Sequence, residues 1–119
     1  MLKEQERLDD LIKENLKIIQ NDEVFSFSTD ALLLAHFTKV RKNDSILDLC
    51  AGNGVIALLL SAKSHQKIES IEIQEQLADM AQRSFKYNRL EERLSMHNMD
   101  LKDVYQTFKP SQSVSYTHL

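Results

Sequence analysis

The chain contains only two glycines, Gly52 and Gly54, and a single residue separates them. Glycine adopts positive φ at little steric cost and lets a ligand approach the backbone closely. Residues 45–49 before this pair predict a short buried strand, and the apolar residues 55–60 after it predict a buried helix. A strand, a glycine turn and a helix in this order favour a loop that binds a nucleotide-containing cofactor. The alternative interpretation is an ordinary strand-to-helix turn.

Length and composition limit the class of protein. With 119 residues, 42% hydrophobic and 28% charged, the chain has the composition of a small soluble globular protein with one core. It contains no apolar run of the roughly 20 residues that a membrane span needs, and no signal-peptide segment at its start. We therefore expect a cytoplasmic protein without membrane association. The single cysteine, Cys50, excludes an internal disulfide and a cysteine-rich zinc site, and we expect no metal.

The apolar patterns beyond residue 44 alternate between strand and helix periods. They predict strands at about 45–49, 67–73 and 94–99, and helices at about 53–63 and 74–87. This alternation implies right-handed crossovers and a mainly parallel sheet, an α/β fold.

The first 44 residues predict an N-terminal extension. An amphipathic helix is expected from about Leu8 to Ile19, turning extended near residues 17–20 and pairing with a short strand at 23–27. A buried helix is expected over 28–37, capped by Ser28 or Thr29. Residues 45–110 would form the sheet-containing part. Residues 111–119 show no periodic pattern and are expected to be an unstructured, possibly non-native tail.

Three acidic residues follow or end the predicted strands. The segment from Gly52 to Ala57 matches the dinucleotide pattern G-x-G-x-x-A, and Glu72 lies twenty residues after Gly52. That pattern alone does not distinguish NAD from S-adenosylmethionine. Asp48, four residues before Gly52, would repel a pyrophosphate, whereas it would attract the ammonium and sulfonium groups of S-adenosylmethionine.

The other two acids suit the rest of this cofactor. Glu72 would accept both ribose hydroxyls, and Asp100 would accept the adenine amino group with Leu101 against the base. Asp79 and Asp103 fall on outward or loop positions and are interpreted as solvated charges.

The segments Asp48-Leu49-Cys50-Ala51-Gly52-Asn53-Gly54 and Ile71-Glu72-Ile73-Gln74 resemble the first and second motifs of the class I S-adenosylmethionine-dependent methyltransferases. The resemblance implies a Rossmann-like fold with three α/β/α layers, of which this chain would be an incomplete part. Cys50 departs from the family pattern, because a glycine usually opens the first motif. The implied cofactor-binding residues are Asp48, Cys50, Ala51, Gly52, Asn53, Gly54, Glu72, Ile73, Asp100 and Leu101.

An upstream block narrows this resemblance. The run Phe25-Ser26-Phe27-Ser28-Thr29-Asp30, followed by Ala31-Leu32-Leu33-Leu34-Ala35, resembles the N-terminal signature of bacterial tRNA(Val) adenine-N6 methyltransferases. The resemblance implies methyl transfer to an adenine in the tRNA anticodon loop, and secondary cofactor contacts from Phe27, Ser28 and Asp30.

The catalytic Asn-Pro-Pro-Tyr motif of that family is absent from this sequence. We expect it downstream of Pro110 in a longer protein, so no catalytic residue is assigned here and the chain alone is expected to lack turnover. Three alternatives remain open: a protein glutamine-N5 methyltransferase, a nicotinamide-dependent oxidoreductase domain and a non-catalytic cofactor-binding module.

Overall fold

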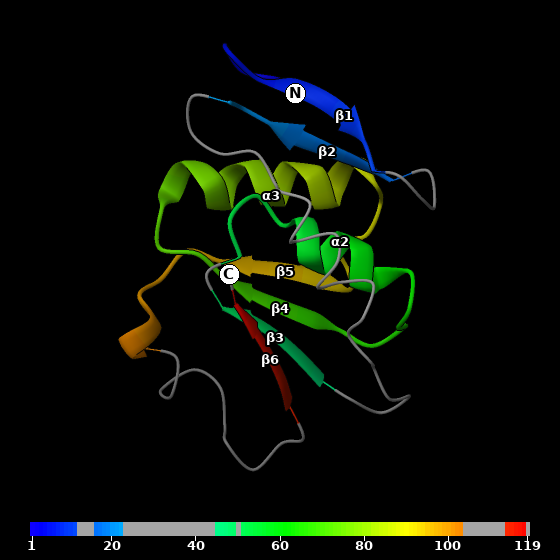
Figure 1. Cartoon of the computed structure of the whole chain (residues 1–119), viewed down its shortest axis with the longest axis vertical. Coiled ribbons are helices and arrows are strands. Elements are labelled where there is room, and N and C mark those ends of the chain that lie inside the picture. The colour runs from blue at the N-terminus through cyan, green and yellow to red at the C-terminus, as the bar shows by residue number, and fades with distance from the viewer. Residues whose placement is uncertain (12–15, 23–44, 50, 104–113, 119) are drawn as a thin grey trace.

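A β-hairpin, two helices and a four-stranded sheet are stacked in that order in the computed structural model (Figure 1). The structure describes residues 1–11, 16–22, 45–49, 51–103 and 114–118. The expected strand at 23–27 and the expected helix over 28–37 lie outside these residues. No helix in the described ranges is both long and apolar enough to cross a lipid bilayer.

The sheet is parallel throughout, and its order is β5-β4-β3-β6. Its strands are β3 (Ser45–Leu49), β4 (Ile68–Ile71), β5 (Leu94–His97) and β6 (Val114–His118). The register aligns Ile46 with Ile68, and Ile68 with Leu94. The three strands that the sequence predicts before residue 100 are confirmed, and so is their parallel arrangement.

The strand β6 was not expected. It pairs in parallel with β3, with Ser45 opposite Val114 and Leu49 opposite His118. The prediction of an unstructured segment over 111–119 is therefore wrong for residues 114–118. The segment has no periodic pattern of its own, but it contains valine, tyrosine and threonine, which favour strands, and the edge of β3 supplies the hydrogen-bonding partner. The division of the chain at residues 44 and 110 stays a prediction.

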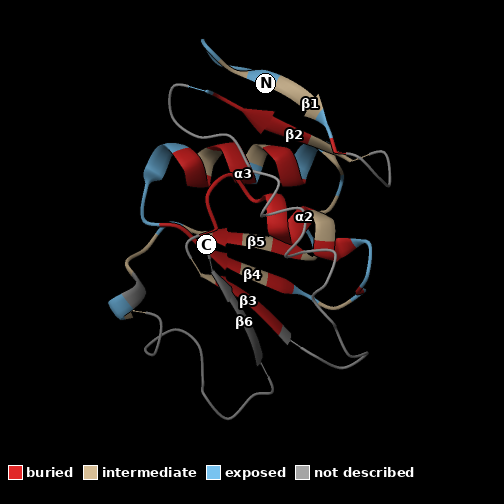
Figure 2. Ribbon diagram, in the orientation of Figure 1, coloured by how far each residue is buried: buried red, intermediate tan, exposed pale blue. Residues whose placement is uncertain are grey.

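The helices α2 (Val55–Ser61) and α3 (Glu75–Tyr87) confirm the helical periods of the sequence. The residues expected on the inner face of α3 are all buried: Leu77, Met80, Ala81, Ser84 and Phe85. Ala81 and Phe85 belong to the core that the helices share with the sheet, whereas Leu77 and Met80 pack with Ile19 under the hairpin. Figure 2 shows these buried stretches of α3 between the hairpin and the sheet. A short 3-10 helix, η1 (Leu101–Asp103), follows β5.

The N-terminal residues form a hairpin of β1 (Arg7–Asp10) and β2 (Lys17–Gln20). The strands pair antiparallel, with Leu8 opposite Ile19. The extended conformation expected near residues 17–20 is confirmed, whereas the helix expected from Leu8 is wrong over 7–10. Here, cross-strand pairing and burial override a helix-like spacing of apolar residues, because Leu8 packs against Ile19 and the inner face of α3.

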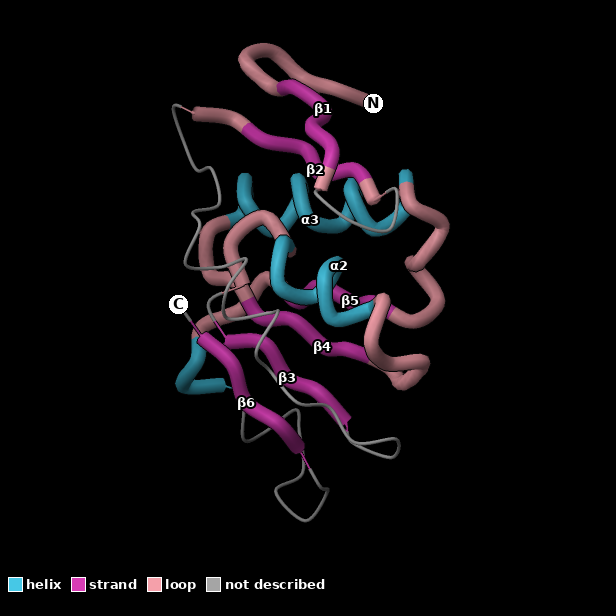
Figure 3. The backbone as a smooth tube through the Cα atoms, turned by 45° about the vertical axis from the view of Figure 1, so that its right-hand side comes forward, coloured by secondary structure: helices cyan, strands magenta, loops and turns pink. Residues whose placement is uncertain are grey.

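The hairpin lies on α3 (Figure 3). The side chains of Ser84 in α3 and of Asn88, the C-cap residue of this helix, bind backbone groups of β2. The side chain of Asn88 accepts from the Lys17 N–H at 2.8 Å and donates to the Lys17 carbonyl at 2.6 Å. The Ser84 hydroxyl accepts from the Ile19 N–H at 2.9 Å. These side chains bind the peptide groups of Lys17 and Ile19 in the way that a neighbouring strand would.

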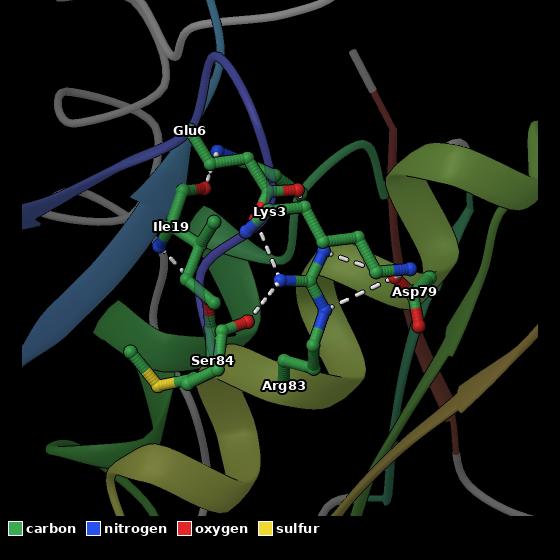
Figure 4. Close-up of polar contacts among 8 residues, drawn as sticks. Lys3, Glu6, Ile19, Asp79, Arg83 and Ser84 are labelled. Carbon is green, nitrogen blue, oxygen red and sulfur yellow. Dashed lines mark hydrogen bonds and ion pairs between the residues drawn. The ribbon is translucent and has the colours of Figure 1, made fainter.

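Arg83 of α3 forms an ion pair with Glu6, the residue directly before the hairpin (Figure 4). Its guanidinium donates to both carboxylate oxygens of Glu6, at 2.6 Å each. The Glu6 side chain is only 2% exposed, and the Arg83 hydrogen bonds hold the pKa of its carboxyl below the ordinary value. Asp79 forms ion pairs with Lys3 and with Arg83, at 2.9 Å each. The interpretation of Asp79 as a solvated charge is therefore wrong.

We expect Glu6→Gln to lower the free energy of unfolding by about 1–3 kcal/mol at pH 7, since hydrogen bonds to a shielded charged pair are lost. The pKa of Glu6 is lower in the folded chain, so its contribution is present above the unfolded pKa of about 4.3 and disappears as the pH falls through the folded pKa. Urea unfolding of both proteins between pH 7 and pH 3 measures this difference. Glu4→Gln, at an exposed neighbouring carboxylate, is the control. A difference that does not become smaller as the pH falls below about 4.3 would contradict the assignment.

Candidate functional site

The carboxyl ends of β3, β4 and β5 meet at one edge of the sheet, because these neighbouring strands are parallel. Ligands of open α/β sheets bind outside the carboxyl ends of the strands. The glycine turn follows β3, Glu72 follows β4, and Asp100 follows β5. The structure thus brings to one edge the segments that the sequence singled out.

Both glycines of the turn adopt positive φ, +58° at Gly52 and +89° at Gly54. The Gly54 N–H donates to the Ala51 carbonyl at 3.1 Å, which closes the turn. The Gly54 carbonyl then accepts from the Leu58 N–H at 3.0 Å, so the turn leads directly into α2. The conformational reason for having glycine at these two positions is confirmed.

Gly54 also lies against α3. A Cβ atom at this position would be 2.8 Å from Cε1 of Phe85 and 3.1 Å from Cβ of Ala81. Real Cβ atoms essentially never come as close as 2.8 Å to another atom, so any larger residue would push the turn away from the helix. The turn can therefore approach α3 this closely only with glycine at position 54.

Glu72 joins the turn to the beginning of α3. Its carboxylate accepts from the Gly52 N–H through Oε1 and from the Gln74 N–H through Oε2, at 2.9 Å each. The residue is 6% exposed. An ionised carboxylate offers about four acceptor positions, so two hydrogen bonds leave capacity for a pair of ligand hydroxyls.

Asn98, which the sequence analysis missed, holds the backbone after β4. Its Nδ2 donates to the carbonyls of Glu72 and Ile73, at 3.0 Å each. The only sequence signal is an amide residue near the end of the strand predicted over 94–99, and it does not by itself indicate a partner. Asn98 thereby fixes the backbone from which the Glu72 side chain extends.

Two predicted residues are completely shielded from solvent. Asp48 and Asn53 are both 0% exposed. Asp48 lies within β3, two residues after Ile46, and therefore on the sheet face that the helices cover. Its neighbour in register is Ser70 of β4. Asn53 donates from Nδ2 to the Ile19 carbonyl at 3.1 Å, which links the turn to the hairpin.

The remaining predicted residues lie around this edge. Ile73 is exposed, with 61% of its surface accessible, and Ala51 is buried. Asp100 is half-buried, and its Oδ1 accepts from the Lys102 N–H at 3.1 Å where η1 begins at Leu101. Four predicted residues lie outside the described part of the chain: Cys50, Phe27, Ser28 and Asp30. Within that part, no group of three or more His, Cys, Asp or Glu residues could hold a metal ion.

The sequence of residues 15–113 matches the protein-family model of the methyltransferase small domain. The chain belongs to the methyltransferase small domain family. The methyl donor of this family is S-adenosylmethionine. The expected class I methyltransferase relationship and α/β fold are thereby confirmed, and the oxidoreductase alternative is not supported.

Relatives and solved structures agree with this assignment. The chain is 35% identical over 80 residues to the tRNA1(Val) (adenine(37)-N6)-methyltransferase of Actinobacillus succinogenes, covering 66% of this chain and 34% of that protein. It is 25% identical over 92 residues to the enzyme of that name from Shewanella sediminis, covering 77% and 38%. The chain thus spans less than two-fifths of the length of either relative.

The crystal structure of P. horikoshii TYW2 in complex with MeSAdo has the same fold. It superposes with a TM-score of 0.68 at 23% identity, over 85% of this chain and 38% of that one.

We expect Gly54→Ala to lower the free energy of unfolding by about 2–3 kcal/mol, from positive-φ strain and overpacking against Phe85. In a Phe85→Leu background the same change should cost only about 1 kcal/mol, because the steric part is relieved and the φ strain remains. Urea unfolding of the four proteins gives both values. Equal costs in the two backgrounds would show that the contact with Phe85 does not constrain the turn.

Proposed function

We propose that this chain is the S-adenosylmethionine-binding part of a methyltransferase that modifies the N6 amine of an adenine in tRNA. The observation that carries the proposal is the carboxylate of Glu72, which the N–H groups of Gly52 and Gln74 hold beside the glycine turn. A buried carboxylate that is already oriented accepts hydroxyl groups without first losing side-chain freedom. In this proposal it accepts the two ribose hydroxyls of the cofactor.

The surroundings of Glu72 suit the other parts of the cofactor. The exposed side chain of Ile73 offers an apolar surface for the adenine, and the half-buried carboxylate of Asp100 offers an acceptor for the adenine amino group. The positive-φ turn lets a ligand approach the backbone between β3 and α2. The bound cofactor supplies an electrophilic methyl group, and these residues bind and orient it.

The charge near the turn favours S-adenosylmethionine over a dinucleotide. Asp48 and Glu72 bring two shielded carboxyl groups to the ends of neighbouring strands. A pyrophosphate placed there would meet like charges at low dielectric, whereas an ammonium and a sulfonium group would be attracted. A direct contact between Asp48 and the cofactor is part of this proposal.

The methyl acceptor is inferred from the names of the relatives, which act on adenine 37 of tRNA1(Val), and from the resemblance of residues 25–35. In this proposal the acceptor base is bound, and the methyl transfer carried out, by the whole protein, since the chain spans less than two-fifths of the length of these relatives. The chain itself would bind the cofactor without turnover. A tRNA substrate also implies a cytoplasmic location.

Calorimetric titration tests the cofactor directly. S-adenosylhomocysteine should bind the chain, and Glu72→Gln should weaken binding by about 1.5–3 kcal/mol, roughly tenfold to more than a hundredfold, since hydrogen bonds to a charged group are lost. The control is Glu69→Gln on the same strand, whose carboxylate pairs with His97 rather than with the turn. Heat with NAD but not with S-adenosylhomocysteine would overturn the proposal, and an unchanged affinity of Glu72→Gln would remove Glu72 from the site.

Ile73→Ala should weaken S-adenosylhomocysteine binding about fivefold, which corresponds to losing about 1 kcal/mol of apolar contact with the adenine. Because Ile73 is exposed, the free energy of unfolding should change by no more than about 0.5 kcal/mol. Calorimetry and urea unfolding separate the two effects. Tyr87→Ala, at another exposed apolar residue, should leave the affinity unchanged. Equal losses in both variants would mean that Ile73 does not contact the base.

A further inference from the structure

We propose that Asn53 is a positioning residue through which the N-terminal hairpin orders the glycine turn of the cofactor site. Its side chain joins the glycine turn to the Ile19 carbonyl of β2 at 3.1 Å, so that the order of the turn and the docking of β2 depend on each other. The dependence of the turn on the hairpin stands on the ligand-free geometry alone. Its effect on cofactor binding rests on the function proposed above.

The peptide groups of Ile19 are held from two sides. The Ile19 N–H donates to the hydroxyl of Ser84 in α3 (Figure 4), and the Ile19 carbonyl accepts from Asn53 in the turn. All three residues are buried, so water does not replace these bonds without local opening. Residue 19 is therefore the point where the hairpin, α3 and the turn are joined.

Three consecutive residues hold the turn, each through a different element. Gly52 donates to Glu72 after β4, Asn53 donates to Ile19 of β2, and Gly54 lies against Phe85 of α3. Asn53 provides the only one of these three links that reaches the hairpin among the described residues. A change that loosens β2 should therefore disorder the turn through loss of the Asn53 hydrogen bond.

The amide of Asn53 also has an acceptor to spare. Its Oδ1 is buried and has no hydrogen-bond partner in the part of the chain that the structure describes. Buried polar atoms in native proteins are rarely left in this state, and an unmade bond of this kind points to a group that completes it. A water molecule, or a ligand donor admitted by a small opening of the turn, would do so while Nδ2 keeps its bond to Ile19.

A ligand that completes this amide therefore stabilises the docked hairpin as well. By thermodynamic linkage, the coupling works in both directions. A ligand that orders the turn makes the opening of β2 less favourable, and a β2 that is less firmly docked lowers the affinity for the ligand. Amide hydrogen exchange reports both, because the Gly52 N–H belongs to the turn and the Ile19 N–H belongs to β2.

The first experiment needs no ligand. Exchange at the Gly52 amide is compared in the wild type, Ser84→Ala, Asn53→Ala and the double variant, with the Ile71 amide of β4 as the reporter of global opening. Ser84→Ala should speed exchange at Gly52 at least fivefold beyond its effect on Ile71, and should add nothing in the Asn53→Ala background. Ser61→Ala is the matched control, since the hydroxyl of this buried serine donates to the Leu58 carbonyl of its own helix, at 2.5 Å.

Two results would overturn the coupling. One is an equal effect of Ser84→Ala and Ser61→Ala on the Gly52 amide, and the other is a Ser84→Ala effect that persists without Asn53. Should Asn53→Ala fail to fold, the comparison of Ser84→Ala with Ser61→Ala decides on its own, because neither substitution touches the turn.

The second experiment adds S-adenosylhomocysteine. In the wild type it should slow exchange at the Ile19 amide at least threefold beyond its effect on Ile71. In Asn53→Ala it should bind about tenfold more weakly and, at saturation, leave the Ile19 amide unprotected beyond that reporter. Equal protection of Ile19 in both proteins would overturn the cofactor link. If the wild type does not bind S-adenosylhomocysteine, the proposed function fails, while the ligand-free experiment still decides whether the hairpin orders the turn.

Discussion

The carboxylate of Glu72 is the interaction on which the arrangement of the site depends. It holds the Gly52 N–H on one side and the Gln74 N–H on the other, so it connects the turn after β3 with the start of α3. Two backbone donors at 2.9 Å orient the carboxylate before any ligand arrives. In the proposed site, the side chain that would bind the ligand is therefore also the one that holds the neighbouring turn in place.

The glycine turn adds a second constraint, of shape. Gly54 combines a φ of +89° with a distance to Phe85 that leaves no room for a Cβ atom. The turn therefore needs glycine for its backbone conformation and for its contact with α3. This explains why a chain with only two glycines has both of them here.

Much of the central fold could be predicted from the sequence because its signals are local. The period of α3 and the apolar strands β3 and β4 follow from residue spacing, and Glu72 follows from its distance to the turn. The hairpin and β6 could not be predicted, since both depend on partners distant in the sequence. Leu8 is extended because it pairs with Ile19 and packs on α3, and β6 forms against the edge of β3. The hydrogen bonds of Asn98 and Ser84 leave no local pattern either.

The way in which α3 and the turn hold β2 has a consequence for how such sequences diverge. Asn88, Ser84 and Asn53 bind the backbone of β2 at Lys17 and Ile19, not the side chains there. A peptide group is the same whatever residue carries it, proline excepted. These hydrogen bonds therefore constrain the identity of the three side chains that bind the strand, not the identity of the strand residues they contact. The constraint on the strand's own side chains comes from packing, since Ile18 and Ile19 are both buried, in separate apolar clusters.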